Sequence, residues 1–346
     1  MIWFDVTKAG RAGHRSGLQR VSARLGGELG AAVTPVRWAD AGWVEAATGR
    51  PVAPGPADWL LTAELFATEE RPGFAAWLAA RPCRRAAVFH DAIPLQWPRI
   101  TWPQSVARHP GYMKLLAAFD RVWAVSAASR ADLLGYWRWL GLEAVPPVET
   151  LALGADFDGT PRAGRAGRRE PELLCVGILE PRKHQEFLLE VCEGLWGEGL
   201  AFTLHLVGRV NPHFGRPIAD RVRELQRAGR AVRHHDGADD AELAARYASA
   251  RVTVFPTRAE GCGLPLLESL WRGVPCVCSD LPVLRENADG GGCVPVPVGD
   301  LAAWRETLRR ALTDDAWVAG LAAEAAARRL PTWRETAAQV ATGLNR

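Results

Sequence analysis

Short apolar runs alternate with longer stretches of helical periodicity along most of this chain, and this alternation restricts its fold more than any other feature. Strands that alternate with helices form parallel sheets, because two parallel strands need a long crossover between them. At 346 residues the chain is also too long for one ordinary hydrophobic core. The sequence therefore predicts an α/β protein with two sheet-centred domains.

The apolar runs give the expected strands and the periodic stretches the expected helices. Strands are expected at residues 1–6, 33–38, 59–62, 86–90, 121–125, 172–179, 202–207, 232–235, 252–256, 275–279 and 293–296. Helices are expected over 17–29, 126–140 and 331–344, and beginning near residues 185, 217, 241, 264, 281 and 300.

Glycine, proline and arginine become dense between residues 149 and 171, where apolar periodicity is lost. Such a composition is typical of a linker. We therefore expect a first domain over 1–155, a linker over 156–170 and a second domain over 171–328. Residues 329–346 are expected to form a helix that returns to the first domain.

The charge is nearly balanced, with 42 basic and 39 acidic residues, so a nucleic-acid partner is not expected. Short arginine clusters are interpreted as solvated surface, with peripheral contact to an anionic membrane as the alternative. The clusters are Arg81, Arg84 and Arg85, and Arg162, Arg165, Arg168 and Arg169.

The seven cysteines are an odd set, and several of them lie inside apolar runs, which indicates buried thiols in a reducing compartment. The chain starts with a strand-like run without the features of a signal peptide, and no apolar run is long enough to span a bilayer. These observations predict a cytoplasmic protein.

The segment from Val252 to Glu268 is the most informative part of the sequence. A strand leads into Glu260, Gly261, Cys262 and Gly263, and a helix is expected to open at Leu264. Glycines let a backbone approach a ligand closely, and free N–H groups at a helix start favour an anion. This segment therefore predicts a phosphate site.

Two carboxylates flank that helix start, eight residues apart, at Glu260 and Glu268. Each can accept two hydroxyl hydrogen bonds, which suits the diols of sugars and ribose. The alternative is that Glu260 caps the helix and Glu268 is solvated.

A second cluster, Arg182 and Lys183, precedes the helix expected from Gln185. Cations are disfavoured at a helix N-terminus, so an anion held between them would explain the pair. Two exposed basic side chains are the alternative.

Polar residues also follow a buried strand of the first half, at His90 and Asp91. Ligands bind at the carboxyl ends of parallel strands, although a lone histidine is more often structural. Gly17 opens a helix after the first strand and would allow another backbone or a substrate to approach closely.

Asp156 and Asp158 have metal-binding spacing but lie in the linker, so we expect no metal site. His234 and His235 point to opposite faces of a strand and cannot chelate together.

These motifs together resemble glycosyltransferase family 4, the retaining enzymes of GT-B fold, in its mannosyltransferase-like branch. The similar runs are residues 260–268 (Glu-x7-Glu), 176–183, 206–208, 273–275 with 279–280, and 333–337; weaker matches lie at 16–21, 90–95 and 125–129.

The resemblance implies two Rossmann-like domains with parallel sheets facing across a cleft. It assigns Arg182 and Lys183 to the diphosphate and Glu268 to the ribose. Glu260 and the backbone of 261–264 would contact the donor sugar, and His90 its far hydroxyls. Asp91, Gly17 and Gly177 complete the expected site.

The implied reaction transfers a hexose, first of all mannose from GDP-mannose, to a hydroxyl of a glycan or lipid-linked acceptor with retention. It implies no metal and no bound cofactor. UDP, ADP or dTDP sugars, a non-catalytic nucleotide-sugar sensor, and an epimerase or phosphorylase remain alternatives. Cys262 and His184 depart from the usual aromatic residue and Asn, which leaves donor specificity open.

Overall fold

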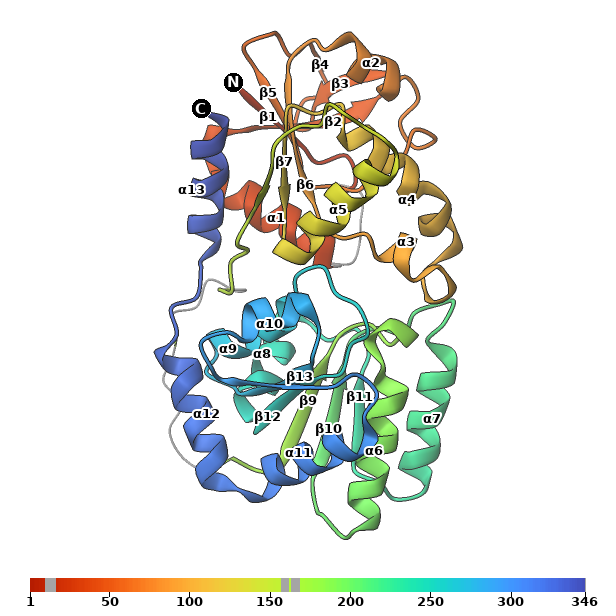
Figure 1. Cartoon of the computed structure of the whole chain (residues 1–346), viewed down its shortest axis with the longest axis vertical. Coiled ribbons are helices and arrows are strands. Elements are labelled where there is room, and N and C mark those ends of the chain that lie inside the picture. The colour runs from red at the N-terminus through yellow and green to blue at the C-terminus, as the bar shows by residue number, and fades with distance from the viewer. Residues whose placement is uncertain (10–16, 157–161, 163–168, 346) are drawn as a thin grey trace. The chain divides into compact units, whose positions relative to one another are not determined.

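The computed structural model describes residues 1–9, 17–156, 162 and 169–345. It divides into two compact units, each built on one sheet (Figure 1). Unit 1 consists of Met1–Gly154 together with Pro331–Arg346, and unit 2 is Ala155–Leu330. The α/β class predicted from the alternation of strands and helices is confirmed.

Among the described residues of unit 1, eight strands form one sheet in the order β4-β3-β2-β1-β5-β6-β7-β8. The strands are β1 (Ile2–Asp5), β2 (Thr34–Ala39), β3 (Gly42–Glu45), β4 (Pro51–Val52), β5 (Trp59–Thr62), β6 (Arg84–Phe89), β7 (Arg121–Ala124) and β8 (Val148–Thr150). The helices are α1 (Gly17–Leu29), α2 (Phe74–Ala80), α3 (Ile93–Gln96), α4 (Pro103–Leu116), α5 (Ala127–Trp139) and α13 (Trp333–Leu344).

All neighbouring strands of this sheet are parallel except at one edge, where β3 pairs antiparallel with β2 and β4. This hairpin was not among the elements expected from the sequence. Its turn places Asp40 and Ala41 at φ of 48° and 64°, the left-handed values that a two-residue hairpin turn requires. Because Ala41 stands where glycine is the usual signal, the pattern gave no sign of the turn.

Unit 2 has a fully parallel six-stranded sheet in the order β11-β10-β9-β12-β13-β14. Its strands are β9 (Glu172–Val176), β10 (Thr203–Val207), β11 (Val232–His235), β12 (Val252–Phe255), β13 (Cys276–Ser279) and β14 (Cys293–Val296). Its helices are α6 (Gln185–Gly197), α7 (Arg216–Arg227), α8 (Asp240–Ser249), α9 (Leu264–Trp271), α10 (Pro282–Ala288), α11 (Leu301–Thr313) and α12 (Asp315–Ala327).

The strand order of each sheet reverses at one point. In unit 2 the chain runs from β9 outward to β10 and β11, and then returns to β12 on the other side of β9. In unit 1 it runs from β1 to β2, and later continues from β5 on the other side of β1. Ligands of open α/β sheets bind at the carboxyl ends of the strands beside such a reversal.

The last helix, α13, packs on α1 within unit 1. The Thr336 hydroxyl donates to the Ala152 carbonyl at 2.8 Å. Residues 151, 153 and 155 are buried, and β8 ends only at Thr150. The first residues of the glycine-rich and proline-rich region, up to Gly154, thus belong to unit 1, where Leu151 and Leu153 are buried. Within the described ranges, no helix combines the length and hydropathy needed to cross a membrane.

Gly154 lies close against the start of α13. A Cβ atom at this position would lie 2.3 Å from the backbone nitrogen of Trp333. We expect Gly154→Ala to lower the free energy of unfolding by about 1 to 3 kcal/mol, the usual cost of overpacking. Gly135→Ala is the matched control, because a Cβ there meets nothing within 4 Å. Calorimetric melting of the wild type and both variants measures the effect. A Gly154→Ala protein that melts at the wild-type temperature would contradict the tight approach of α13.

Candidate active site

The reversal point of unit 2 brings together the two loops that the sequence analysis singled out. One loop follows β9 and contains Arg182 and Lys183 in a single 3-10 turn, Pro181–Lys183. The other follows β12 and contains Glu260. The Arg258 N–H donates to the Arg182 carbonyl at 2.8 Å, so the loops are joined through their backbones.

Glu260 lies between the two cations. Lys183 Nζ donates to Glu260 Oε1 at 2.5 Å, and an Arg182 guanidinium N–H donates to the same oxygen at 3.1 Å. The Thr257 hydroxyl adds a third donor at 2.8 Å. Arg182 also pairs with Glu180 at 2.7 Å. A single carboxylate oxygen is therefore the centre of the cluster.

This cluster is buried: the side chains of Lys183 and Glu260 are each 9% exposed. Burial raises the pKa of Glu260, but the charges of Lys183 and Arg182 outweigh it and hold the pKa below its usual value. Burial lowers the pKa of Lys183, and Glu260 opposes that shift. The pair is stable as ions because each partner compensates the other.

The anion that the sequence analysis expected between the two cations is, in this structure, the carboxylate of Glu260. Within the described loop Glu260 does not cap α9, whose N-cap residue Gly263 makes no side-chain cap bond. Two exposed basic side chains, the alternative for Arg182 and Lys183, is also wrong, because Lys183 is buried.

The helix start at α9 is where the phosphate site was predicted. Gly263 has a φ of 83°, and a Cβ there would lie 2.5 Å from a Leu284 methyl carbon, so only glycine fits. The Cys262 carbonyl accepts a hydrogen bond from Asn287, which fixes the loop. Gly177, with a φ of 150°, begins the neighbouring loop against the Lys183 side chain. The backbone at Gly177 is thus held close to the Lys183 side chain.

Glu268 lies one turn further along α9 and is only 3% exposed. The Tyr247 hydroxyl from α8 donates to its Oε2 at 3.1 Å. The alternative of a solvated Glu268 is therefore wrong. Sequence spacing located the carboxylate but not its tyrosine partner, which belongs to no motif.

In unit 1, His90 follows β6 and is buried, with Nε2 2.8 Å from the Ala63 carbonyl. Burial lowers the pKa of His90, so its ring is neutral near pH 7. The neighbouring Asp91 accepts the N–H of Ile93, the first residue of α3, at 3.0 Å. Both residues lie at the carboxyl edge of the sheet, as the strand pattern predicted.

The reversal point of unit 1 holds a charged cluster that the sequence analysis missed. Asp5 ends β1, Glu64 follows β5, and Arg71 bonds to both, at 2.7 and 3.1 Å. All three are at most 5% exposed. Glu64 also accepts the N–H groups of Lys8 and Ala9. The position of Asp5, a charged residue at the end of an apolar strand, could have indicated this cluster from the sequence.

Other predicted residues take no part in these clusters. Gly17 begins α1, where a Cβ would meet nothing within 4 Å. Asp158 and Ser16 lie outside the described residues.

His234 Nε2 lies 2.8 Å from the Gly208 carbonyl, whereas His235 Nε2 is 2.9 Å from His205 Nδ1, so the two adjacent rings have separate partners. In the described part of the chain, no three His, Cys, Asp or Glu side chains could hold a metal ion.

The first arginine cluster has acidic and aromatic partners. Arg85 is buried and pairs with Asp120, which also binds Arg81, and Arg84 stacks on Trp59 at 4.6 Å. These contacts leave less free positive charge for a membrane than the sequence suggests. In the second cluster, Arg162 donates to backbone carbonyls of α12 and α9; Arg165 and Arg168 lie outside the described residues.

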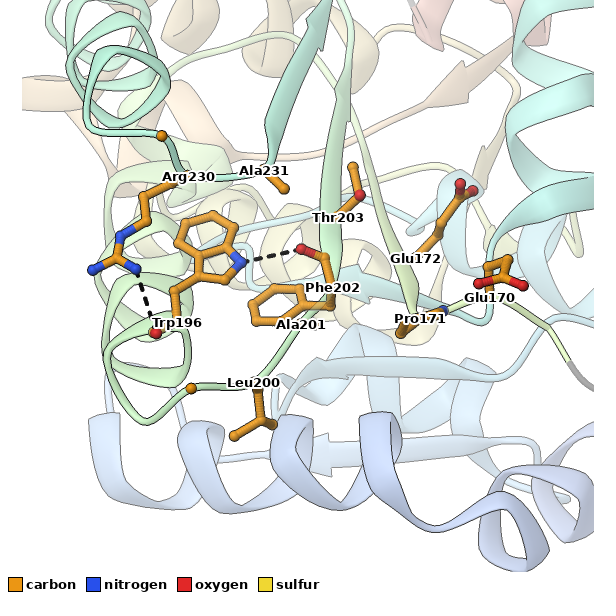
Figure 2. Close-up of a pocket in the computed structure, with 12 residues that line it drawn as sticks. Glu170, Pro171, Glu172, Trp196, Leu200, Ala201, Phe202, Thr203, Arg230 and Ala231 are labelled. Carbon is orange, nitrogen blue, oxygen red and sulfur yellow. Dashed lines mark hydrogen bonds between the residues drawn. The ribbon is translucent and has the colours of Figure 1, made fainter.

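A hollow of about 510 Å³ lies at the opposite, amino edge of the unit 2 sheet (Figure 2). Trp196 stacks on Phe202 at 4.9 Å on one side of it, and Glu170 and Glu172 lie on the other. The Trp196 ring N–H is satisfied by the Phe202 carbonyl. Because parallel sheets bind ligands at the carboxyl edge, we place the candidate site at the loops after β9 and β12.

The two sheet-centred units have the GT-B fold of solved glycosyltransferase structures. Residues 170–314 match the family described as Glycosyl transferases group 1. A sucrose-phosphate synthase from Thermosynechococcus elongatus has the same fold, with a TM-score of 0.73, 19% identity, and coverage of 99% of this chain and 98% of that one.

The curated relatives include mannosyltransferases. The serotype-specific mannosyltransferase WbdA of Escherichia coli is 28% identical over 216 residues, which are 58% of this chain and 26% of that protein. The O-antigen chain mannosyltransferase B of Escherichia coli is 34% identical over 149 residues, 42% of this chain and 37% of that protein. The chain thus spans well under half the length of these relatives. The resemblance to the mannosyltransferase-like branch is confirmed.

The ion cluster gives a stability prediction. Lys183→Met and Glu260→Gln should each lower the free energy of unfolding by roughly 2 to 4 kcal/mol, because each leaves a buried charge without its partner. The double variant should lose clearly less than the sum of the two. Urea denaturation followed by tryptophan fluorescence measures all three, with Lys114→Met, at an exposed position, as control. Additive losses would show that the two side chains do not share one ion pair.

The cluster in unit 1 gives a pH prediction. Burial and the charge of Asp5 raise the pKa of Glu64 from 4.5 to about 7. Between those values the folded protein keeps a proton that the unfolded chain releases, so stability should fall as pH rises. Relative to Glu64→Gln, the wild type should lose about 2 to 3 kcal/mol across this window, since one pKa unit is worth ~1.4 kcal/mol.

Chemical denaturation of both proteins from pH 4.5 to pH 7.5 tests this expectation. Glu69→Gln is the control, because that side chain is exposed and should leave the pH slope of the wild type unchanged. Parallel stability curves for wild type and Glu64→Gln would show that Glu64 titrates normally.

Proposed function

We propose that this chain is a retaining, metal-independent glycosyltransferase that moves a hexose from a nucleotide sugar to a hydroxyl of a glycan or lipid-linked acceptor. The first choice of donor is GDP-mannose, because the relatives include two mannosyltransferases by name. The function would belong to the synthesis of cell-surface polysaccharide.

The observation that carries the proposal is the cluster at the reversal point of unit 2. Arg182 and Lys183 both bond to Glu260 in the loop that leads into α9, so two cations converge on one place. The positive end of the α9 helix dipole follows directly in the chain. A nucleoside diphosphate could replace the carboxylate of Glu260 as their counter-anion and would be stabilised as a leaving group. Its charge would then be compensated without a divalent cation.

The remaining residues have separate roles in this proposal. The Glu268 carboxylate would accept the ribose hydroxyls, and Glu260, released from the cations, would contact the donor sugar together with the backbone of Gly261. His90, neutral and buried in unit 1, would contribute a ring nitrogen to the sugar. The acceptor hydroxyl would attack from the face that the diphosphate leaves, with a diphosphate oxygen taking its proton.

The test is sugar transfer by the full chain. Radiolabelled GDP-mannose and, in parallel, UDP, ADP and dTDP sugars are incubated with a mannose-terminated oligosaccharide acceptor, with and without EDTA. We expect labelled product from one donor, undiminished by EDTA, and proton NMR of the new anomeric signal should show the configuration of the donor.

Three outcomes would contradict parts of the proposal. Product with the inverted anomer would exclude retention, and restoration by manganese after EDTA would exclude metal independence. Donor binding in calorimetry without transfer to any acceptor would favour the nucleotide-sugar sensor.

A further inference from the structure

Tyr247 and Glu268 form a buried contact between two helices of unit 2. Tyr247 lies on α8 and Glu268 on α9, and they are 1% and 3% exposed. The tyrosine hydroxyl is 3.1 Å from Glu268 Oε2 and 3.4 Å from the Pro265 carbonyl. The shorter contact is to the charged acceptor, which forms the stronger hydrogen bond.

The tyrosine ring is fixed by its own surroundings. It packs in a small apolar cluster with Leu174, Leu243 and Val274, and the Arg272 guanidinium lies over its face at 5.3 Å. Burial and the neighbouring Glu268 charge raise the pKa of Tyr247 well above its usual value. The hydroxyl therefore remains protonated at physiological pH, and the nearer of its two acceptors is the carboxylate.

A carboxylate has about four acceptor positions on two oxygens, and a rigid donor on one of them restricts how it can rotate. This restriction matters for a carboxylate that must accept hydrogen bonds from two neighbouring hydroxyls at once. A carboxylate that rotates freely loses conformational entropy when the ligand binds, and this loss weakens binding.

We propose that Tyr247 is a positioning residue for donor binding, whose hydroxyl holds the Glu268 carboxylate in the orientation that accepts the ribose hydroxyls of a nucleoside diphosphate. This inference rests on the proposed function, because it requires that Glu268 faces ribose. It adds to the site a residue from a helix that contributes no motif.

The experiment compares ribose recognition in four proteins: wild type, Tyr247→Phe, Glu268→Gln and Tyr136→Phe. Tyr136→Phe is the matched control, since its hydroxyl donates to the Pro110 carbonyl at 3.0 Å in unit 1. Calorimetry gives the dissociation constants of GDP, UDP and ADP. The tightest of the three is then compared with its 2′,3′-dideoxy form, which lacks the hydroxyls.

In the wild type we expect the ribose form to bind at least about tenfold more tightly than the dideoxy form, the usual value of a hydrogen bond to a charged group. Glu268→Gln should abolish most of this ratio, and Tyr247→Phe should reduce it at least about threefold through the ribose form alone. Tyr136→Phe should keep it. A merely structural tyrosine would lower the melting temperature without changing the ratio.

The outcomes separate the two proposals. A ratio that falls in Glu268→Gln but not in Tyr247→Phe overturns the role of Tyr247 and leaves the proposed function intact. A ratio that is unchanged in both variants removes Glu268 from the ribose site. Absence of binding by all three diphosphates overturns the proposed function and this inference together.

Discussion

One carboxylate oxygen between two cations holds the candidate site of unit 2 together. Glu260 is the partner that makes the burial of Lys183 tolerable, and the same contact joins the loops that follow two different strands. Breaking either side would leave a charge in a poorly solvated place. Under the proposed function a diphosphate would have to compete with this internal anion. Ligand binding would then be an exchange of partners, whose net free energy is smaller than the new contacts alone suggest.

The reversal point of unit 1 uses a different charge balance. Glu260 faces two cations, and its pKa is lowered, whereas Glu64 shares Arg71 with Asp5, and its pKa is raised. The same residue type therefore has opposite proton affinity at equivalent positions of two similar sheets. Both carboxylates are buried, so their charged neighbours decide the difference: two cations surround Glu260, whereas Glu64 has one cation and the second carboxylate of Asp5, whose charge raises its pKa.

The strands and the positions of the motifs could be predicted well from the sequence, but the side chains that contact one another could not. Each of the expected strands exists, since an apolar run between turn residues leaves little choice of structure. The hairpin at Asp40 and Ala41 stayed hidden because its turn lacks glycine. Glu64 and Tyr247 were missed for another reason: their roles depend on contacts across 7 to 56 positions, which periodicity does not record.

The return of α13 to unit 1 makes that unit discontinuous in the chain, while unit 2 is continuous. All residues of unit 2 are therefore synthesised before the helix that packs on α1. Unit 1 meets its partner α13 only after the whole of unit 2 has been synthesised. During synthesis the face of α1 on which α13 packs therefore stays without this partner until residues 333–344 have been added.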